Sequence, residues 1–222
     1  YLYSLQYARE RRQGRHPDNK DPSAPPVAII EHADVRRMLL LQKCWVEGAQ
    51  ALGFYASMLV DRAQDPDEKV RRESDLLLEL LTPILKAWGS DYSLRANDLA
   101  IQILGGYGFT REYPVEQSYR DNRINPIHEG TNGIQALDLL GRKAMMQNGA
   151  ALKLLLQRIG ATCSEAAALP ELLELSAQLL EGVKLAERST QAVAARMAKG
   201  EVRLALANAG HYMTLLGHLT IG

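Results

Sequence analysis

Apolar residues at helical spacing along nearly the whole chain are the feature that most constrains its fold. From Glu31 to Arg62 they recur on one wide face of a single long helix. The same spacing returns in four later segments, at about residues 83–104, 150–166, 171–199 and 201–220. No segment shows the alternation of apolar and polar residues that is typical of a strand. The sequence therefore predicts an all-α protein.

Composition and charge exclude several classes of protein. Hydrophobic residues make up 46% of the 222 positions, enough for a substantial core, and the formal net charge is zero. A neutral chain predicts binding to neither nucleic acid nor an anionic membrane surface. No apolar run reaches the roughly 18 residues that a membrane span needs.

The two cysteines and the chain ends give further expectations. Cys44 and Cys163 lie far apart in apolar helical segments, without metal-type spacing, so we expect free buried thiols in a reducing cytoplasm. The chain opens on Tyr1 without a methionine, and apolar periodicity still continues at Gly222. We therefore expect it to be part of a longer polypeptide.

The N-terminal segment predicts a helix over residues 1–13 that carries arginines at its end. Cations in a last turn interact favourably with the helix dipole, which gives this cluster a purely structural explanation. Gly14 is expected to end the helix, and residues 15–26 form a polar, proline-rich connection.

Two further boundaries follow from capping residues and proline. Asp65 is expected to be the N-cap of a helix, with Pro66 as its first residue and Glu68 completing a capping box. Thr82-Pro83 either kinks this helix or begins a new one, and we expect a separate long helix from about residue 83 to Leu104.

The stretch from Gln102 to Gln135 contains the candidate chemistry. Three glycines follow the predicted helix and permit positive φ and close backbone approach; they are Gly105, Gly106 and Gly108. After a short helix opened by Pro114, Glu129 stands in a loop just before a helix that begins at Gly130 or Thr131. A carboxylate in that place suits a single general base, although a glutamate is also favoured at any helix start by the dipole.

Several motifs in this stretch resemble the C-terminal helical domain of the acyl-CoA dehydrogenase family. The sequence pieces are AIQILGGYGF at 100–109, EYPVE at 112–116, RD at 120–121, IHEGT at 127–131 and IQ at 134–135. YARERRQG at 7–14 resembles the arginine-bearing segment of the same domain. The resemblance covers roughly residues 1–145. It implies an up-and-down bundle of four or five helices over residues 1–147, followed by the start of a C-terminal helical extension at 148–222.

The resemblance implies that Glu129 is the catalytic base of an FAD-dependent enzyme. Such enzymes oxidise an acyl-CoA thioester to the 2-enoyl-CoA: a carboxylate removes the α-proton while the β-hydrogen leaves as hydride to FAD. The backbone N–H of the glutamate and a flavin hydroxyl stabilise the thioester oxygen, mainly in the transition state.

Matching positions imply the cofactor contacts. Gln102, Gly105 and Gly106 resemble a contact to the adenosine diphosphate part of FAD across a dimer interface. An ordinary helix C-cap followed by a turn would use the same glycines.

Other matching positions lie at the two ends of the resemblance. Arg11, with Gln13 beside it, corresponds to residues that contact the flavin pyrophosphate of the neighbouring subunit in this family. A guanidinium suits that role because it can donate two parallel hydrogen bonds to phosphate oxygens. Thr131 matches a flavin-contacting threonine, and equally suits a helix N-cap.

The sequence departs from the family pattern near the base. His128 stands where the family often has an aromatic residue, and three roles are open to it: tuning Glu129, hydrogen-bonding substrate, or packing. Gly133 replaces a polar residue, which puts one flavin contact in doubt. His211 and His218 share one helical face, and we interpret them as structural; no metal is expected.

The function expected from the whole is an FAD-dependent acyl-CoA dehydrogenase. Expected partners are the acyl-CoA substrate, an electron-transfer flavoprotein or similar acceptor, and further copies in a homodimer or homotetramer. The alternatives are an acyl-CoA oxidase and a non-catalytic relative that binds flavin or assembles with a partner. Because most of the flavin and CoA site lies elsewhere in this family, the isolated chain is expected to be inactive.

Overall fold

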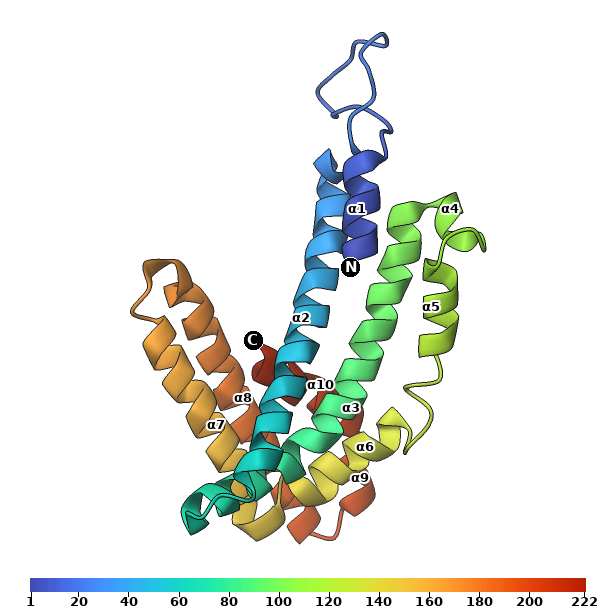
Figure 1. Ribbon diagram of the computed structural model, residues 1–222. Helices are drawn as coiled ribbons and strands as arrows, with labels where there is room; N and C mark the ends of the chain where they lie inside the picture. The colour runs from blue at the N-terminus through green and yellow to red at the C-terminus, as the bar shows by residue number, and fades with distance from the viewer. The chain divides into compact units, whose positions relative to one another are not determined.

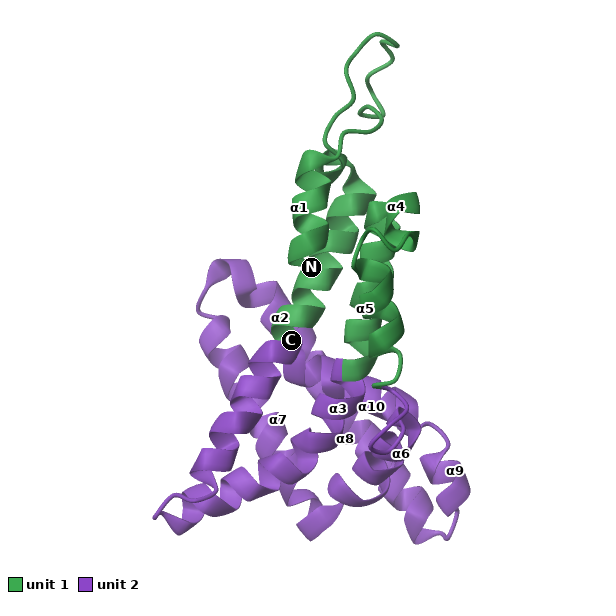
Figure 2. Cartoon of the chain, turned by 45° about the vertical axis from the view of Figure 1, so that its right-hand side comes forward, with its two compact units in different colours: residues 1–48, 90–125 green, residues 49–89, 126–222 purple.

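The computed structural model describes all 222 residues, and all of its regular structure is helical (Figure 1). The chain divides into two compact units, residues 1–48 with 90–125 and residues 49–89 with 126–222 (Figure 2). The long helices α2 (Ala33–Arg62) and α3 (Glu68–Leu104) contribute residues to both units. The prediction of an all-α protein is confirmed, and none of its helices is both long and apolar enough to cross a membrane.

The first unit begins with α1 (Leu2–Glu10), which is shorter than the predicted helix over residues 1–13. It ends because Arg11 is extended, with φ −69° and ψ 122°, and Arg12 then forms an isolated antiparallel bridge with Ala28. Only Arg9 therefore lies in the last turn of the helix. Gly14, with φ +70°, belongs to the following loop and does not end the helix, so that expectation was wrong.

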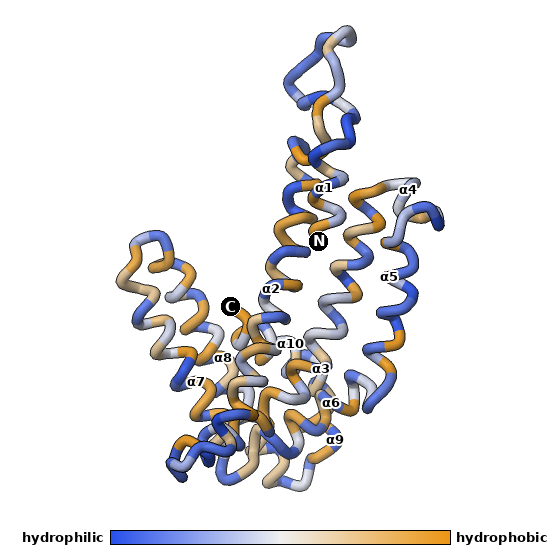
Figure 3. The backbone as a smooth tube through the Cα atoms, in the orientation of Figure 1, coloured by the Kyte–Doolittle hydropathy of each residue, from blue (hydrophilic) through white to orange (hydrophobic).

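The core of the first unit joins α1 to parts of α2 and α3 and to α5 (Val115–Asn122). Its buried residues are Ala8, Ile29, Met38, Leu39, Ala100, Ile103, Leu104 and Val115. Four of the eight, Ala8, Met38, Leu39 and Ile103, occupy the apolar positions that predicted the helices, and Figure 3 shows apolar and polar segments alternating along these elements. Inside this core the Gln42 amide donates a hydrogen bond of 2.6 Å to the Ala96 carbonyl, which ties α2 to α3.

Helix α3 differs from the prediction at its start. It begins at Glu68, and the carboxylate of Asp67 accepts a hydrogen bond of 2.8 Å from the Lys69 N–H. The cap is therefore Asp67, two residues beyond the predicted Asp65. The Asp65 carboxylate instead accepts a hydrogen bond of 2.9 Å from the Asp67 N–H, in the turn before the helix.

Pro83 lies inside α3, so no new helix begins there. A proline in a helix costs about 3 kcal/mol because it removes one hydrogen bond and crowds the preceding turn. Leu80, Leu81 and Ile84 flank it and are fully buried. Burying a leucine or isoleucine side chain contributes about 1.5–3 kcal/mol, so three such side chains outweigh the proline.

The second unit contains most of the later helices. They are α6 (Asn132–Asp138), a π-helical turn η2 (Leu139–Lys143), α7 (Met146–Ala166), a 3-10 turn η3 (Pro170–Leu172), α8 (Leu173–Ala198), α9 (Val202–Leu206) and α10 (Ala209–Ile221). Helix α7 packs against α8, and α10 packs against both α6 and α8. The single helix predicted over residues 201–220 is thus two helices, α9 and α10.

Residues 147–149 interrupt α7 with left-handed backbone. Gln147, Asn148 and Gly149 have φ of 49°, 57° and 76°, so right-handed helix resumes at Ala150, close to the predicted start. The predicted boundary between the bundle (1–147) and the extension (148–222) falls within these residues and stays a prediction.

Candidate functional site

Glu129 lies at a sharp turn that leads into α6. It is exposed, and its φ of +55° is left-handed, a conformation that non-glycine residues adopt at a cost of about 1–2 kcal/mol. Gly130 continues the turn with φ +80°. Strained backbone of this kind persists only when surrounding contacts hold it.

Helix α3 holds this turn through a lysine. The Lys86 ammonium donates hydrogen bonds to the Gly130 carbonyl at 2.7 Å and to the Asn132 side-chain oxygen at 2.9 Å. The Asn132 amide in turn donates to the Ala87 carbonyl at 3.1 Å. The Asn132 backbone N–H also closes the loop by donating to the Pro126 carbonyl at 3.0 Å.

The start of α6 holds the turn from its other end. The Gln135 side chain donates to the Glu129 carbonyl at 3.1 Å, and Thr131 is the N-cap, its hydroxyl oxygen accepting from the Ile134 N–H at 3.4 Å. The carbonyls of Glu129 and Gly130 are thus both occupied by side chains of the chain itself. No hydrogen bond or ion pair engages the Glu129 carboxylate or its N–H, so both are available to a ligand.

The glycine segment lies in the first unit, where the structure brings Arg11 to it. The Arg11 guanidinium carbon is 5.4 Å from the centroid of the Tyr107 ring, within the range of a cation–π interaction. Tyr107 belongs to the short helix α4 (Gly106–Phe109) and packs on Tyr113, with ring centroids 5.2 Å apart.

Tyr7 connects the same cluster to the end of α3. Its ring meets Tyr113 edge-on at 6.2 Å, and its hydroxyl donates a long hydrogen bond of 3.5 Å to the Leu104 carbonyl. Burial raises the pKa of Tyr7, with nearby Arg11 opposing it, so the phenol stays neutral and able to donate. A cavity of about 340 Å³ is bordered by Arg11, Tyr113 and four α1 residues, Tyr3, Gln6, Tyr7 and Glu10.

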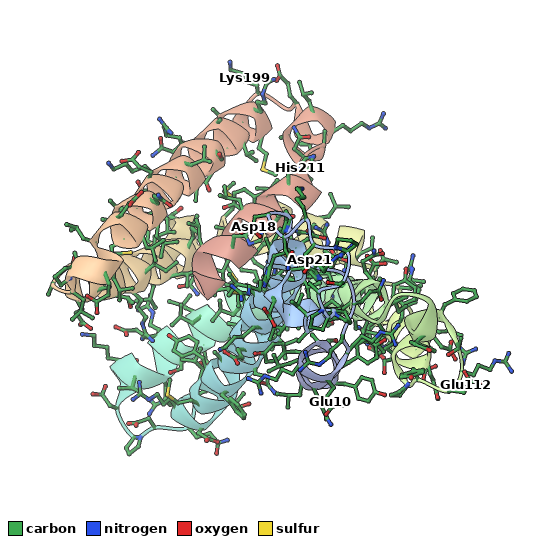
Figure 4. The ribbon with its side chains drawn as sticks, turned by 90° about the horizontal axis from the view of Figure 1, so that it is seen from above. Glu10, Asp18, Asp21, Glu112, Lys199 and His211 are labelled. Atoms are coloured by element: carbon green, nitrogen blue, oxygen red, sulfur yellow. The ribbon has the colours of Figure 1, made fainter.

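The positive charge of Arg11 has no carboxylate partner. Glu10, labelled in Figure 4, instead accepts a hydrogen bond of 3.1 Å from Gln6 one turn earlier. Arg12 donates to the Pro26 carbonyl at 3.4 Å and is thereby committed to the loop. Among the clustered arginines, Arg11 is therefore oriented by an aromatic ring while its charge stays free for an anion.

The structure requires glycine at two of the three positions in the glycine segment, for different reasons. Gly105 has φ +62°, which favours glycine, and a Cβ at Gly108 would lie 2.5 Å from the Ile101 carbonyl oxygen. Gly106 has neither constraint, because a Cβ there would meet nothing within 4 Å. The fold does not require glycine at this position, which fits a backbone that a ligand approaches closely.

The remaining predicted residues also leave donors free. Gln102 and Gln13 have exposed side chains, while the Gln13 carbonyl is fixed by the His32 ring nitrogen at 2.8 Å. A free guanidinium, exposed amides and an uncovered glycine backbone are the donor types that a diphosphate requires, so the first unit fits the proposed part of FAD.

The structure thus groups the predicted residues in two places, Arg11, Gln13, Gln102 and the glycines in one unit and Glu129 with Thr131 in the other. Sequence reasoning missed Lys86, because its partner at Gly130 is 44 residues away and no local pattern links them. It also missed Tyr107, although an aromatic residue between two glycines was a signal that could have pointed to it. Nowhere do three or more His, Cys, Asp or Glu side chains gather in a way that could hold a metal ion.

Comparisons with known proteins identify the sequences and folds that this chain resembles. Residues 3–145 match the family model described as acyl-CoA dehydrogenase, C-terminal domain. A 3-methylmercaptopropionyl-CoA dehydrogenase of Ruegeria pomeroyi is 41% identical over 165 residues, which cover 74% of this chain and 28% of that protein. The chain therefore spans about a quarter of the length of the curated relatives it matches.

Solved structures share the fold. Caenorhabditis elegans ACDH-11 in complex with C11-CoA has a TM-score of 0.79 at 19% identity, over 98% of this chain and 34% of that one. An acyl-CoA dehydrogenase complexed with FAD from Bacillus anthracis has a TM-score of 0.54 at 22% identity, over 99% of this chain and 42% of that one.

Proposed function

Because this chain belongs to the acyl-CoA dehydrogenase family, with the C-terminal domain at residues 3–145, we propose that it supplies the catalytic base of an acyl-CoA dehydrogenase. In this proposal the chain acts as the C-terminal part of a longer enzyme that converts an acyl-CoA thioester to the 2-enoyl-CoA. The base is Glu129.

The observation that carries the proposal is the orientation of the Glu129 turn. Lys86 and Gln135 occupy the carbonyls of Gly130 and Glu129, and the Glu129 carboxylate and N–H are left without partners. A base must lie within hydrogen-bonding distance of the proton that it removes. Four side-chain hydrogen bonds, made by Lys86, Asn132 and Gln135, fix the turn and so limit the movement of Glu129 away from that position.

The reaction then uses two groups of one residue. A Glu129 carboxylate oxygen takes the α-proton, the Cα–Cβ bond becomes double, and the β-hydrogen departs with its electron pair. The Glu129 N–H donates to the thioester oxygen, on which negative charge grows in the transition state. When bound, FAD supplies the oxidant that accepts the departing hydride.

Arg11, Gln13, Gln102, Gly105 and Gly106 are proposed to hold the diphosphate part of FAD. The unpaired guanidinium of Arg11 beside the glycine turn supports this assignment. Since the family resemblance implies that the contact crosses a subunit interface, a homodimer or homotetramer is part of the proposal. Thr131 is proposed as a further flavin contact, although its oxygen already caps α6. The proposal also includes an electron-transfer flavoprotein or similar protein as the electron acceptor, and a cytoplasmic location.

Replacing Glu129 with Gln in the full-length protein tests the proposal. Acyl-CoA should bleach the flavin of the wild type, and Glu129→Gln should slow that bleaching by about 10²–10⁴-fold, the typical contribution of a general base. Glu171→Gln, at another helix start, is the matched control and should leave the rate unchanged. An undiminished rate in Glu129→Gln would contradict the catalytic role and favour a non-catalytic flavin-binding relative. Peroxide formed during turnover would instead identify an oxidase.

A further inference from the structure

Helix α10, which lies outside the residues matched by the family model, packs directly on the helix that holds the Glu129 turn. Gly217 of α10 lies against Trp88 of α3. A Cβ at Gly217 would lie 2.2 Å from Cδ1 and 2.8 Å from Cγ of the indole, so no side chain fits there without a shift. Trp88 is only 2% exposed, which leaves its ring little room to yield.

Neighbouring side chains fix the same contact. The His218 ring meets the Trp88 ring edge-on, with centroids 5.9 Å apart and an interplanar angle of 87°. Leu216 and Leu219, which flank Gly217 and His218 in the sequence, are buried. The C-terminal turns of α10 are therefore fixed against Trp88 by the close fit at Gly217 and by the ring contact of His218.

Trp88 stands directly after the two residues that hold the Glu129 turn. Lys86 binds the Gly130 carbonyl and Asn132, and the Ala87 carbonyl accepts from the Asn132 amide at 3.1 Å. Consecutive residues of one helix move together because the backbone hydrogen bonds hold them. A displacement of Trp88 would therefore displace both anchors of the turn.

Helix α10 also packs on α6, which continues from the same turn. Ala136 of α6 is buried, four residues beyond Asn132, where α6 begins, and one residue beyond Gln135, which binds the Glu129 carbonyl. The extension thus supports the Glu129 turn from both of its anchoring helices.

We propose that α10 is a positioning element for Glu129, with Gly217 and His218 as positioning residues that act through Trp88. This inference rests on the proposed function of Glu129 as base. It assigns to the C-terminal extension a part in the chemical step: it keeps the carboxylate at the substrate α-carbon.

A matched pair of glycine substitutions in the full-length flavoprotein tests it. Gly217 and Gly210 both lie in α10, but a Cβ at Gly210 meets nothing within 4 Å. Flavin reduction is measured at saturating acyl-CoA per bound FAD, with α-protonated and α-deuterated substrate. Gly217→Ala should slow reduction about tenfold or more, since a misplacement of 1 Å can cost about 100-fold, and should raise the α-deuterium isotope effect. Gly210→Ala should match the wild type in both.

A second variant shows whether the indole contact is the cause. In a Trp88→Leu background the clash is relieved, so adding Gly217→Ala should have little further effect, as a double-mutant cycle would reveal. If Gly217→Ala does not fold, His218→Ala provides the readout: reduction slows severalfold, and amide hydrogen exchange in residues 126–135 rises. Rates and isotope effects equal to those of Gly210→Ala would overturn the proposal. An undiminished rate in Glu129→Gln would instead overturn the proposed function, so the two failures are distinct.

Discussion

The ammonium of Lys86 lies 2.7 Å from the carbonyl oxygen of Gly130, the residue directly after Glu129. The same ammonium reaches the Asn132 side chain at 2.9 Å, so one cation on α3 spans the turn that carries the candidate base. Hydrogen bonds from a charged donor contribute about 1.5–3 kcal/mol each, more than neutral ones. This pair of bonds is therefore strong enough to hold Glu129 in its left-handed conformation.

Lys86→Met should loosen the turn while keeping most of the apolar stem. We expect the free energy of unfolding to fall by about 1–3 kcal/mol, because two acceptors lose their charged donor. In the full-length protein, flavin reduction by acyl-CoA should slow by about tenfold or more, since the base loses its orientation. Urea unfolding and stopped-flow absorbance measure the two effects.

Lys153→Met is the matched control for Lys86→Met. Lys153 is exposed on α7 and forms neither an ion pair nor a side-chain hydrogen bond, so its loss should change stability by less than about 0.5 kcal/mol. Equal effects of the two substitutions would mean that the loss of any lysine charge, and not the bond to Gly130, is responsible.

Most of the helices and the position of Glu129 followed from local signals in the sequence, and the other candidate residues followed from the family resemblance. Apolar periodicity predicted α2, α7 and α8, and a carboxylate before a helix start indicated Glu129. The contacts that fix Glu129 left no such signal, since Lys86 meets the turn only after α3 and α6 have packed.

The errors at helix ends have the same origin. Helix α1 stops at Glu10 because Arg12 pairs with Ala28, a partner that depends on the path of the proline-rich loop. The long helix α3 continues through Pro83 because burial around it outweighs the local preference for a break. In both places tertiary contacts overrule a local rule that was itself applied correctly.

Tyr107 is expected to orient Arg11 for the cofactor diphosphate. Tyr107→Leu removes the aromatic face 5.4 Å from the guanidinium, so the dissociation constant of FAD from the full-length protein should rise severalfold, in line with about 0.5–1 kcal/mol for an exposed cation–π pair. Tyr107→Phe keeps the face and should bind FAD like the wild type. Phe109→Leu, at a ring that is 83% exposed, controls for loss of an aromatic side chain. Equal affinity in all three variants would exclude this role for Tyr107.

Tyr212 predicts a loss of stability at alkaline pH. Burial raises the pKa of Tyr212 above its usual value near 10, and the hydrogen bond of 2.7 Å to Thr190 opposes this shift. The folded state therefore keeps the phenol proton at a pH where the unfolded chain loses it. This contribution is complete below about pH 10 and is lost as the pH rises further, by up to about 1.4 kcal/mol per pH unit. Tyr212→Phe should flatten that decline in urea unfolding curves, whereas Tyr3→Phe, at an exposed ring, should leave it unchanged.

The three glycines beside Tyr107 allow fold and ligand roles to be separated. Gly108→Ala should destabilise the protein by about 1–3 kcal/mol, because its Cβ would lie 2.5 Å from the Ile101 carbonyl oxygen, a backbone atom that cannot rotate away. Gly106→Ala should leave stability unchanged or raise it by up to about 1 kcal/mol, since the site is open and the unfolded chain loses freedom. If a diphosphate approaches the backbone there, the same methyl group should weaken FAD binding at least severalfold. Thermal unfolding and FAD titration would then separate the two variants. Gly108→Ala should mainly lower the stability of the protein, and Gly106→Ala should mainly weaken FAD binding. Unchanged FAD affinity in Gly106→Ala would leave the glycine segment with only its role as a helix end.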